Sequence, residues 1–368
     1  MKKIACGAII AFIGAIYSIA LMALATAMVC MAMGEMAYGD CCWGIMRYSR
    51  CSYRWVLLSL GPPCVFGARL KRKSNTGLNC GAAMAKKCQA AGKERGKMKP
   101  TSLGWFDPMD QTAPIIEPRA LIQSKYPGME MPTLPEKAVM FCLGKGMAVL
   151  EERFSAQTRM EKLPGFIVHS KVDMVADHPG VCFLHGGYGG PQAACTVETL
   201  HALGVQELLL VGLCGGFSPA LQVGDVLIPE RIWSEEGASL HYREKTGFVE
   251  LPSPRVGALT AHLAKAGFSV ENLPTVTTDA VYRQTYHKEA RWRELGCAGV
   301  DMEASAAAAV CAYYGMSCTV ALLVSDKHPQ TPEEPSWRWG SERYGQQLEQ
   351  YITSCVEFAL EENPFCGG

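Results

Sequence analysis

Short apolar runs alternate along the chain with segments whose apolar positions recur at helical spacing. The clearest run is 208–211, four aliphatic residues that end at Gly212, and such an uninterrupted run is typical of a strand covered on both faces. The same pattern predicts further strands at 137–142, 165–171, 180–185, 225–228, 269–277 and 318–324. Glycines follow several of these runs, so we expect tight turns at 144–146, 186–190 and 212–216.

The segments between these strands have helical periodicity. They predict helices at 147–157, 193–203, 254–266, 286–295, 304–314 and 342–361. Gly204, Gly267 and Gly315 stand where glycine commonly ends a helix. Residues 98–136 are rich in proline and predict an extended arm with one short helix near 119–125. Alternating strands and helices predict an α/β fold, a single three-layer domain over 98–368 with a mixed central sheet flanked by helices.

The first 97 residues differ in charge from the rest of the chain. The formal net charge is zero, but residues 1–97 contain 14 Lys/Arg and 3 Asp/Glu, which leaves 21 and 32 of the 35 of each for the remainder. Residues 4–33 contain no charged side chain, and a bilayer is crossed by about 20 apolar residues. We therefore interpret 1–97 as an apolar, basic, Cys-rich extension, either a membrane anchor or the product of a translation start assigned too far upstream.

Several site types find no support in the sequence. The cysteines of the extension form no CxxC pair and the histidines lack ligand spacing, so we expect no metal site. The glycines near 187 and 215 lack the downstream acid of a dinucleotide-binding fingerprint. We also expect no nucleic-acid partner.

Five separated motifs give a more specific indication. In chain order they are Gly187-x-Gly189-Gly190-Pro191, Val211-Gly212-x-Cys214-Gly215, Val223-Gly224-Asp225-Val226, Asp301-Met302-Glu303-Ala304 and Val324-Ser325-Asp326. Their order and spacing resemble the uridine phosphorylase and purine nucleoside phosphorylase family over 137–361. The resemblance implies cleavage of a nucleoside N-glycosidic bond, with inorganic phosphate as co-substrate and no cofactor.

The resemblance also implies roles for particular residues. Met302 would pack on the ribose and Glu303 would accept its hydroxyls, which suits a carboxylate because it can accept two hydrogen bonds at once. Asp326 would protonate the departing base, and this acid favours a purine. Tyr282 and Arg283 fall where base-contacting residues lie. His241 is a further candidate for substrate binding, although alone it would be an ordinary surface or packing residue.

The expected phosphate ligands are the least well matched part of the resemblance. The candidate phosphate-binding positions are Gly144, Gly187, Gly212, Leu213 and Cys214. Leu210 replaces an arginine of the phosphorylases, Leu213 replaces a serine or threonine, and the loop at 144–148 lacks the family's arginine. Because a dianion in a cleft normally needs paired cationic donors, Lys145, Arg153 or an arginine of a neighbouring subunit would have to substitute.

Three hypotheses follow. The first is a nucleoside phosphorylase, a pentosyltransferase of purine salvage, and the second is a nucleosidase that uses water instead of phosphate. The third is a catalytically weak nucleoside-binding protein tethered by the N-terminal segment. The resemblance implies a homo-oligomer, since related sites borrow residues across a subunit interface. We expect a cytoplasmic catalytic domain, associated with a membrane if residues 4–33 form an anchor.

Overall fold

The computed structural model describes residues 112–167, 169–251, 253–340 and 344–361. The extension 1–97, the anchor candidate at 4–33 and the boundary at residue 97 lie outside these residues and stay predictions. Among the described helices, none is long and apolar enough to cross a membrane.

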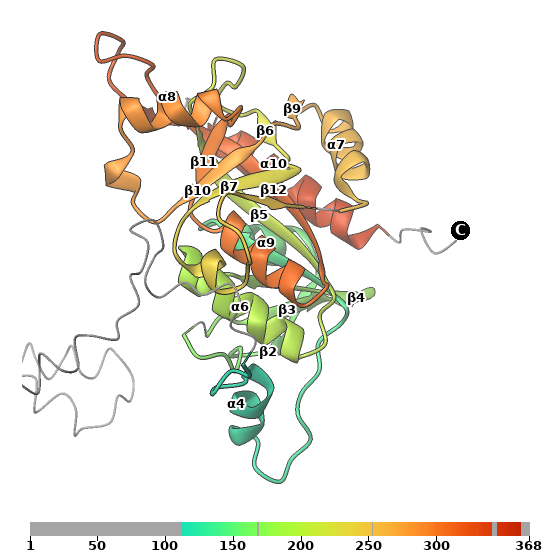
Figure 1. The fold of residues 1–368 in the computed structure, drawn as a ribbon. Coiled ribbons are helices and arrows are strands. Elements are labelled where there is room, and N and C mark those ends of the chain that lie inside the picture. The colour runs from blue at the N-terminus through green and yellow to red at the C-terminus, as the bar shows by residue number, and fades with distance from the viewer. Residues whose placement is uncertain (1–111, 168, 252, 341–343, 362–368) are drawn as a thin grey trace, which may run out of the picture. The chain divides into compact units, whose positions relative to one another are not determined.

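All strands of the described residues join one mixed sheet (Figure 1). Its parallel centre consists of β4 (His178–His185), β1 (Lys137–Cys142), β5 (Glu207–Gly216) and β12 (Ser317–Lys327). One edge continues antiparallel through β3 (Val172–Val175) and β2 (Ala156–Met160). At the other side β11 (Gly299–Asp301) pairs antiparallel with the end of β5 and continues to β10 (Thr275–Thr278), β7 (Arg231–Glu235) and β8 (Phe248–Glu250). The short strands β6 (Val226–Leu227), β9 (Val270–Glu271) and β13 (Arg338–Trp339) join the sheet through β12.

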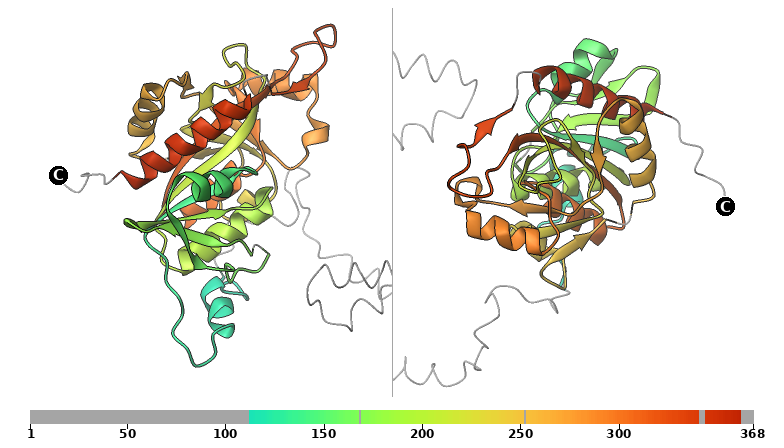
Figure 2. Two further views of the ribbon diagram at one scale, coloured as in Figure 1. Left: turned by 180° about the vertical axis from the view of Figure 1, so that it is seen from behind. Right: turned by 90° about the horizontal axis from the view of Figure 1, so that it is seen from above.

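Helices cover both faces of this sheet (Figures 1 and 2). One face packs against α4 (Pro118–Ser124), α6 (Gly190–Ala202) and α9 (Ala304–Tyr313). The opposite face packs against α5 (Gly146–Arg153), α7 (Val256–Lys265) and α10 (Tyr344–Leu360). Helix α8 (Tyr286–Glu294) packs near β10 and β11 through the buried Trp292, and the 3-10 turns η1 (Ala238–His241) and η2 (Val281–Arg283) lie in the connections. The three-layer α/β prediction is confirmed.

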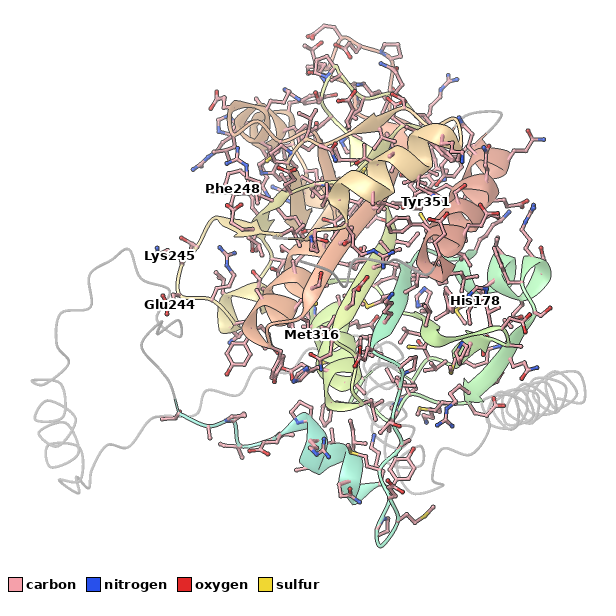
Figure 3. The ribbon with its side chains drawn as sticks, turned by 90° about the vertical axis from the view of Figure 1, so that its right-hand side faces the viewer. His178, Glu244, Lys245, Phe248, Met316 and Tyr351 are labelled. Carbon is pink, nitrogen blue, oxygen red and sulfur yellow. The ribbon has the colours of Figure 1, made fainter. Side chains whose placement is uncertain are left out.

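The alternation along β5 explains its unbroken apolar sequence. Leu208 and Leu210 belong to the core beneath α6 and α9, whereas Leu209 and Val211 belong to the core beneath α5 and α10. A strand covered on both faces has no solvent side for polar residues. On the second face, Tyr351 of α10, labelled in Figure 3, donates a hydrogen bond of 2.7 Å to the carbonyl oxygen of Ala321 in β12.

The tight turn predicted at 212–216 is wrong, because β5 continues through these glycines to Gly216. Glycine is needed at these positions because side chains of β12 pack closely against them. A Cβ on Gly212 would lie 3.1 Å from Leu322 Cδ2, and one on Gly216 would lie 2.9 Å from Val324 Cγ1. The turns predicted at 144–146 and 186–190 are confirmed, and Gly187 and Gly189 have φ values of 81° and 85°.

Other differences fall in short or weakly patterned elements. The described residues 165–167 and 169–171 of one predicted strand form no strand, because the chain pairs instead through β2 and β3 on either side of them. The helix predicted at 147–157 ends at Arg153, and the strand predicted at 269–277 is divided between β9 and β10. The glycines expected to end helices do so, with φ values of 111° at Gly204, 96° at Gly267 and 69° at Gly315.

Candidate functional site

The junction of β11 and α9 is held by a buried carboxylate. Asp301 Oδ2 accepts hydrogen bonds from the backbone nitrogens of Glu303 (3.0 Å) and Ala304 (2.6 Å), and Asp301 Oδ1 accepts one from Thr277 Oγ1 (2.6 Å). These bonds satisfy N–H groups that a helix start leaves without an intrahelical partner. Asp301 thereby fixes the start of α9 and the backbone of Glu303.

The Glu303 side chain reaches back to the loop between β4 and α6. Its Oε1 accepts a hydrogen bond of 2.6 Å from the backbone nitrogen of Gly189, whose positive φ favours glycine. Glu303 is only 7% exposed, and burial together with the neighbouring Asp301 raises the pKa of its carboxyl. The structure thus brings together two of the five motifs at one buried acid.

A third acid, Glu236, completes this cluster. Its carboxylate is buried and accepts hydrogen bonds from Ser305 Oγ of α9 (2.8 Å) and from the backbone nitrogen of Ser239 (3.0 Å). A Cβ on Gly190 would lie 3.0 Å from Glu236 Oε2, so this glycine leaves room for the acid. Glu236 was not among the residues that the sequence predicted for the site. The only feature of the sequence that could have indicated it is the polar stretch at the end of β7, a strand that was not predicted.

The second acidic group lies at the end of β12, around Asp326. Its Oδ1 accepts a hydrogen bond from Ser325 Oγ (2.5 Å), and its Oδ2 contacts His328 Nε2 (3.0 Å) and accepts a bond from Trp337 Nε1 (2.6 Å). Burial raises the pKa of Asp326, but the hydrogen bonds from His328, Ser325 and Trp337 outweigh it, so the pKa lies below its usual value. Sequence analysis missed His328 and Trp337.

The two acidic groups flank the same strand. Gly215 of β5 pairs with Val300 of β11 on one side and with Asp326 of β12 on the other. Between them, burial raises the pKa of the Cys214 thiol, and the charges of Asp301 and Asp326 add to this effect. The end of β5 therefore separates the Glu303 group from Asp326.

The other residues expected to bind the substrate are exposed or half-buried. Tyr282 is 95% exposed on η2, and Arg283 and His241 are exposed as well. Met302, between Asp301 and Glu303, is half-buried. The roles of these four residues in substrate binding stay predictions.

The phosphate-binding candidates occupy different environments. Gly144 is exposed, and a Cβ there would lie 3.7 Å from the Tyr188 hydroxyl. The backbone nitrogen of Gly187 donates to His185 Nδ1 (3.0 Å). Gly212 lies within β5, Leu213 packs against the α5 and α10 core, and Cys214 is buried in the α6 and α9 core.

The position of the missing arginine is buried, and the two cations that could replace it pair with an acid of α10. Leu210, at the position of the missing arginine, is fully buried in the apolar core. Lys145 Nζ lies 3.3 Å from Glu349 Oε1, and Arg153 Nη2 lies 3.5 Å from Glu349 Oε2, so both pair with the same acid of α10. Both side chains are about half exposed.

The described residues contain no group of three or more His, Cys, Asp or Glu that could hold a metal ion.

A cavity of about 570 Å³ lies where α4 approaches the end of α6, and none of the candidate site residues lines it.

Comparisons with known proteins agree with this architecture. A purine nucleoside phosphorylase structure from Toxoplasma gondii, in complex with immucillin-H, matches with a TM-score of 0.53 and 18% identity over 62% of this chain and 91% of that one. This similarity shows the fold.

Sequence relatives cover shorter parts. A guanosine phosphorylase of Halorubrum lacusprofundi is 32% identical over 142 residues, 36% of this chain and 57% of the relative. A DeoD-type purine nucleoside phosphorylase of Clostridium beijerinckii is 28% identical over 45% of this chain and 66% of the relative. A uridine phosphorylase of Salmonella typhimurium is 27% identical over 38% and 61%. The matched part of this chain thus spans between about half and two thirds of the length of these relatives.

A family model described as the phosphorylase superfamily matches residues 147–357, more than half of the chain. This range contains Glu303, Asp326 and the glycine motifs of β4, β5 and α6. The chain belongs to the phosphorylase superfamily.

Proposed function

We propose that this protein cleaves the N-glycosidic bond of a purine nucleoside, with inorganic phosphate as the nucleophile. The observation that carries the proposal is the pair of carboxylates, Glu303 and Asp326, on either side of the end of β5. The family and the phosphorylases among the relatives support this reaction class.

Each carboxylate has a distinct task in this reaction. Glu303, fixed by the Gly189 backbone nitrogen, accepts hydrogen bonds from the ribose hydroxyls and orients the sugar. Asp326, fixed by Ser325 and Trp337, faces the base as it accumulates negative charge and supplies a proton to it. Met302 contributes apolar contact to the sugar.

A second candidate function, hydrolysis with water as the nucleophile, is favoured by the phosphate-binding candidates. Leu210 is buried in the core, and Lys145 and Arg153 both pair with Glu349. A phosphate dianion would have to be bound by backbone N–H groups or by a cation of another subunit.

The two functions give different products. The full-length protein is incubated with a panel of purine and pyrimidine nucleosides, with and without inorganic phosphate, and the sugar product is identified. Phosphorolysis requires phosphate and yields ribose 1-phosphate, whereas equal rates without phosphate and release of free ribose would assign hydrolysis. Calorimetric binding of a nucleoside without turnover would instead identify a nucleoside-binding protein.

We also propose that the protein is a homo-oligomer in which η2 of one subunit completes the site of its neighbour. The extreme exposure of Tyr282 supports this, because an aromatic side chain gains stability when its apolar surface is buried. A mixture of Tyr282→Ala and Glu303→Gln subunits, re-assembled from separate preparations of reduced activity, should be more active than either preparation alone. A mixture no more active than its parents would contradict a shared site.

A further inference from the structure

We propose that Glu289, His328 and Asp326 form a proton relay in which His328, a positioning residue, supplies Asp326 with the proton that the leaving base takes. The inference rests on the proposed function and adds a source for that proton. It concerns two residues, His328 and Glu289, to which sequence analysis gave no role.

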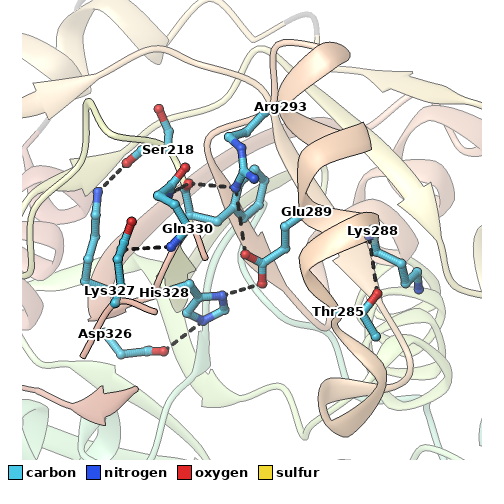
Figure 4. Close-up of polar contacts among 11 residues, drawn as sticks. Ser218, Thr285, Lys288, Glu289, Arg293, Asp326, Lys327, His328 and Gln330 are labelled. Carbon is cyan, nitrogen blue, oxygen red and sulfur yellow. Dashed lines mark hydrogen bonds and ion pairs between the residues drawn. The ribbon is translucent and has the colours of Figure 1, made fainter. Parts of the chain in front are cut away.

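The three side chains form one continuous chain of contacts. Figure 4 shows His328 between Asp326 and Glu289: His328 Nε2 lies 3.0 Å from Asp326 Oδ2, and His328 Nδ1 lies 2.7 Å from Glu289 Oε1. Their side chains are 12% exposed for His328, 6% for Asp326 and 7% for Glu289. Two buried acids on opposite ring nitrogens are satisfied only when both nitrogens carry a proton.

The backbone of β5 is shaped to admit this imidazole. A Cβ on Gly215 would lie closer to His328 Nε2 than van der Waals contact allows. Gly215 pairs with Asp326 across the two strands, so the missing side chain opens space beside the acid. The absence of a side chain at this position therefore permits the contact between His328 and Asp326.

Among the described residues, the neighbouring elements bring the following charged and polar groups close to His328. On α8, Arg293 lies 4.0 Å from the far oxygen of Glu289 and donates to the carbonyl oxygen of Phe217. On β12, Lys327 points away and donates to the carbonyl oxygens of Ser218 and Leu221. Trp337, near β13, adds an uncharged donor to Asp326. Within the described part of the chain, the groups in contact with the imidazole are therefore anionic.

This environment keeps His328 charged. Burial opposes the charge, but the hydrogen bonds to Asp326 and Glu289 outweigh it and raise the pKa of His328 to about 9. Asp326 alone, with its lowered pKa, would be ionised at neutral pH and would have no proton to give. The proton that is available at neutral pH resides on His328.

The proton transfer balances in charge and atoms. The Nε2 proton of His328 first passes to Oδ2 of ionised Asp326. As the glycosidic bond breaks, its electron pair goes to the base, a phosphate oxygen forms the new bond to the sugar, and the base nitrogen takes that same proton from Asp326. The products are a neutral base, ionised Asp326, neutral His328 and ionised Glu289. Protonation of His328 from solvent restores the starting state.

The test is the pH profile of kcat/KM in the full-length protein, with phosphate and the fastest purine nucleoside of the panel. In the wild type, kcat/KM should decline at alkaline pH with a midpoint near the pKa of His328, about 9. In His328→Gln, which has a similar size and can donate to one of the two acids but cannot carry the proton, this alkaline limb should move at least about two pH units lower. We expect a loss of about 100-fold at pH 8 and less than about tenfold at pH 5.5, which a structural role would not produce.

Two further variants separate the relay from damage to the fold. Glu289→Gln should move the limb in the same direction by about one pH unit, whereas Glu294→Gln, an exposed acid on the same helix, should leave it unchanged. Gly215→Ala retains His328 but displaces its ring, and it should reproduce the effect of His328→Gln. Gly180→Ala, at a strand position with open space, is its matched control.

Histidine-selective NMR tests the charge directly. The His328 signal, assigned among the 8 histidines by its loss in His328→Gln, should titrate near pH 9 in the wild type and at least about one unit lower in Glu289→Gln. A midpoint near the ordinary histidine value of about 6.5 would overturn the relay. If the wild type is active and His328→Gln has the same alkaline limb, the relay is overturned and the proposed function stands. If the wild type cleaves no nucleoside, the proposed function is overturned and the relay with it.

Discussion

Replacing Glu303 by glutamine should make the protein more stable and less active at the same time. Glu303 is 7% exposed and close to the buried Asp301, so the folded protein resists ionising it, and the pKa of its carboxyl is raised. Glutamine has nearly the same shape and can still accept the hydrogen bond from Gly189 through its amide oxygen. The variant therefore removes a buried group that can ionise and retains the contact.

The size of the gain follows from linkage. A carboxyl whose pKa is higher in the folded state than in the unfolded state lowers stability as the pH rises above its unfolded value, about 4.3. Each unit of pKa difference corresponds to about 1.4 kcal/mol, so we expect a gain of about 2 kcal/mol or more at pH 7.5 and almost none at pH 4. For a domain of this size that is a rise of about 4 °C in Tm.

Thermal and urea denaturation of wild type and Glu303→Gln at pH 4, 6 and 7.5 measure this gain. Glu244→Gln, at an exposed acid on the loop after η1, is the matched control and should show no difference at any pH. Activity of Glu303→Gln should fall by about 10- to 100-fold, because hydrogen bonds to a charged acceptor contribute about 1.5–3 kcal/mol. Equal stability of variant and wild type from pH 4 to 7.5 would refute the burial argument.

Three further substitutions test other parts of the account. Asp326→Asn should reduce kcat/KM by about 100-fold or more while circular dichroism stays unchanged; retention of full activity would exclude Asp326 as the acid. Tyr351→Phe should lower the free energy of unfolding by about 1 kcal/mol in urea titrations, through loss of its bond to β12, and an unchanged midpoint would show that this bond contributes nothing. Gly146→Ala would place a Cβ against the Phe141 ring and should destabilise by about 1–3 kcal/mol, whereas Gly345→Ala, which meets open space, should not destabilise; equal effects would contradict the packing argument.

The sequence predicts the central layers of the fold because they depend on local patterns. The aliphatic run in β5 and the periodicity of α6, α9 and α10 identify buried strands and helices without knowledge of their partners. Short strands such as β7 and β8 were missed because their apolar and polar residues show no sustained alternation. Their formation depends on the neighbouring strand β10 and on each other.

The glycines of β5 show where a local interpretation fails. A Gly-Gly pair after an aliphatic run commonly marks a turn, but here β5 continues through it. Glycine is needed in this part of β5 because side chains of β12 and His328 occupy the space that a Cβ would take. These contacts join residues more than a hundred positions apart. The Glu303 and Asp326 positions were found through the family resemblance, whereas His328 and Glu289, which are 39 residues apart, meet only in the folded protein.

The most direct test of the proposed function is the rate of base release from a purine nucleoside as phosphate is titrated from zero. We predict that release is negligible without phosphate, rises to saturation with it, and yields ribose 1-phosphate in amounts equal to the free base. A rate that is independent of phosphate, with free ribose as the sugar product, would contradict phosphorolysis and assign water as the nucleophile.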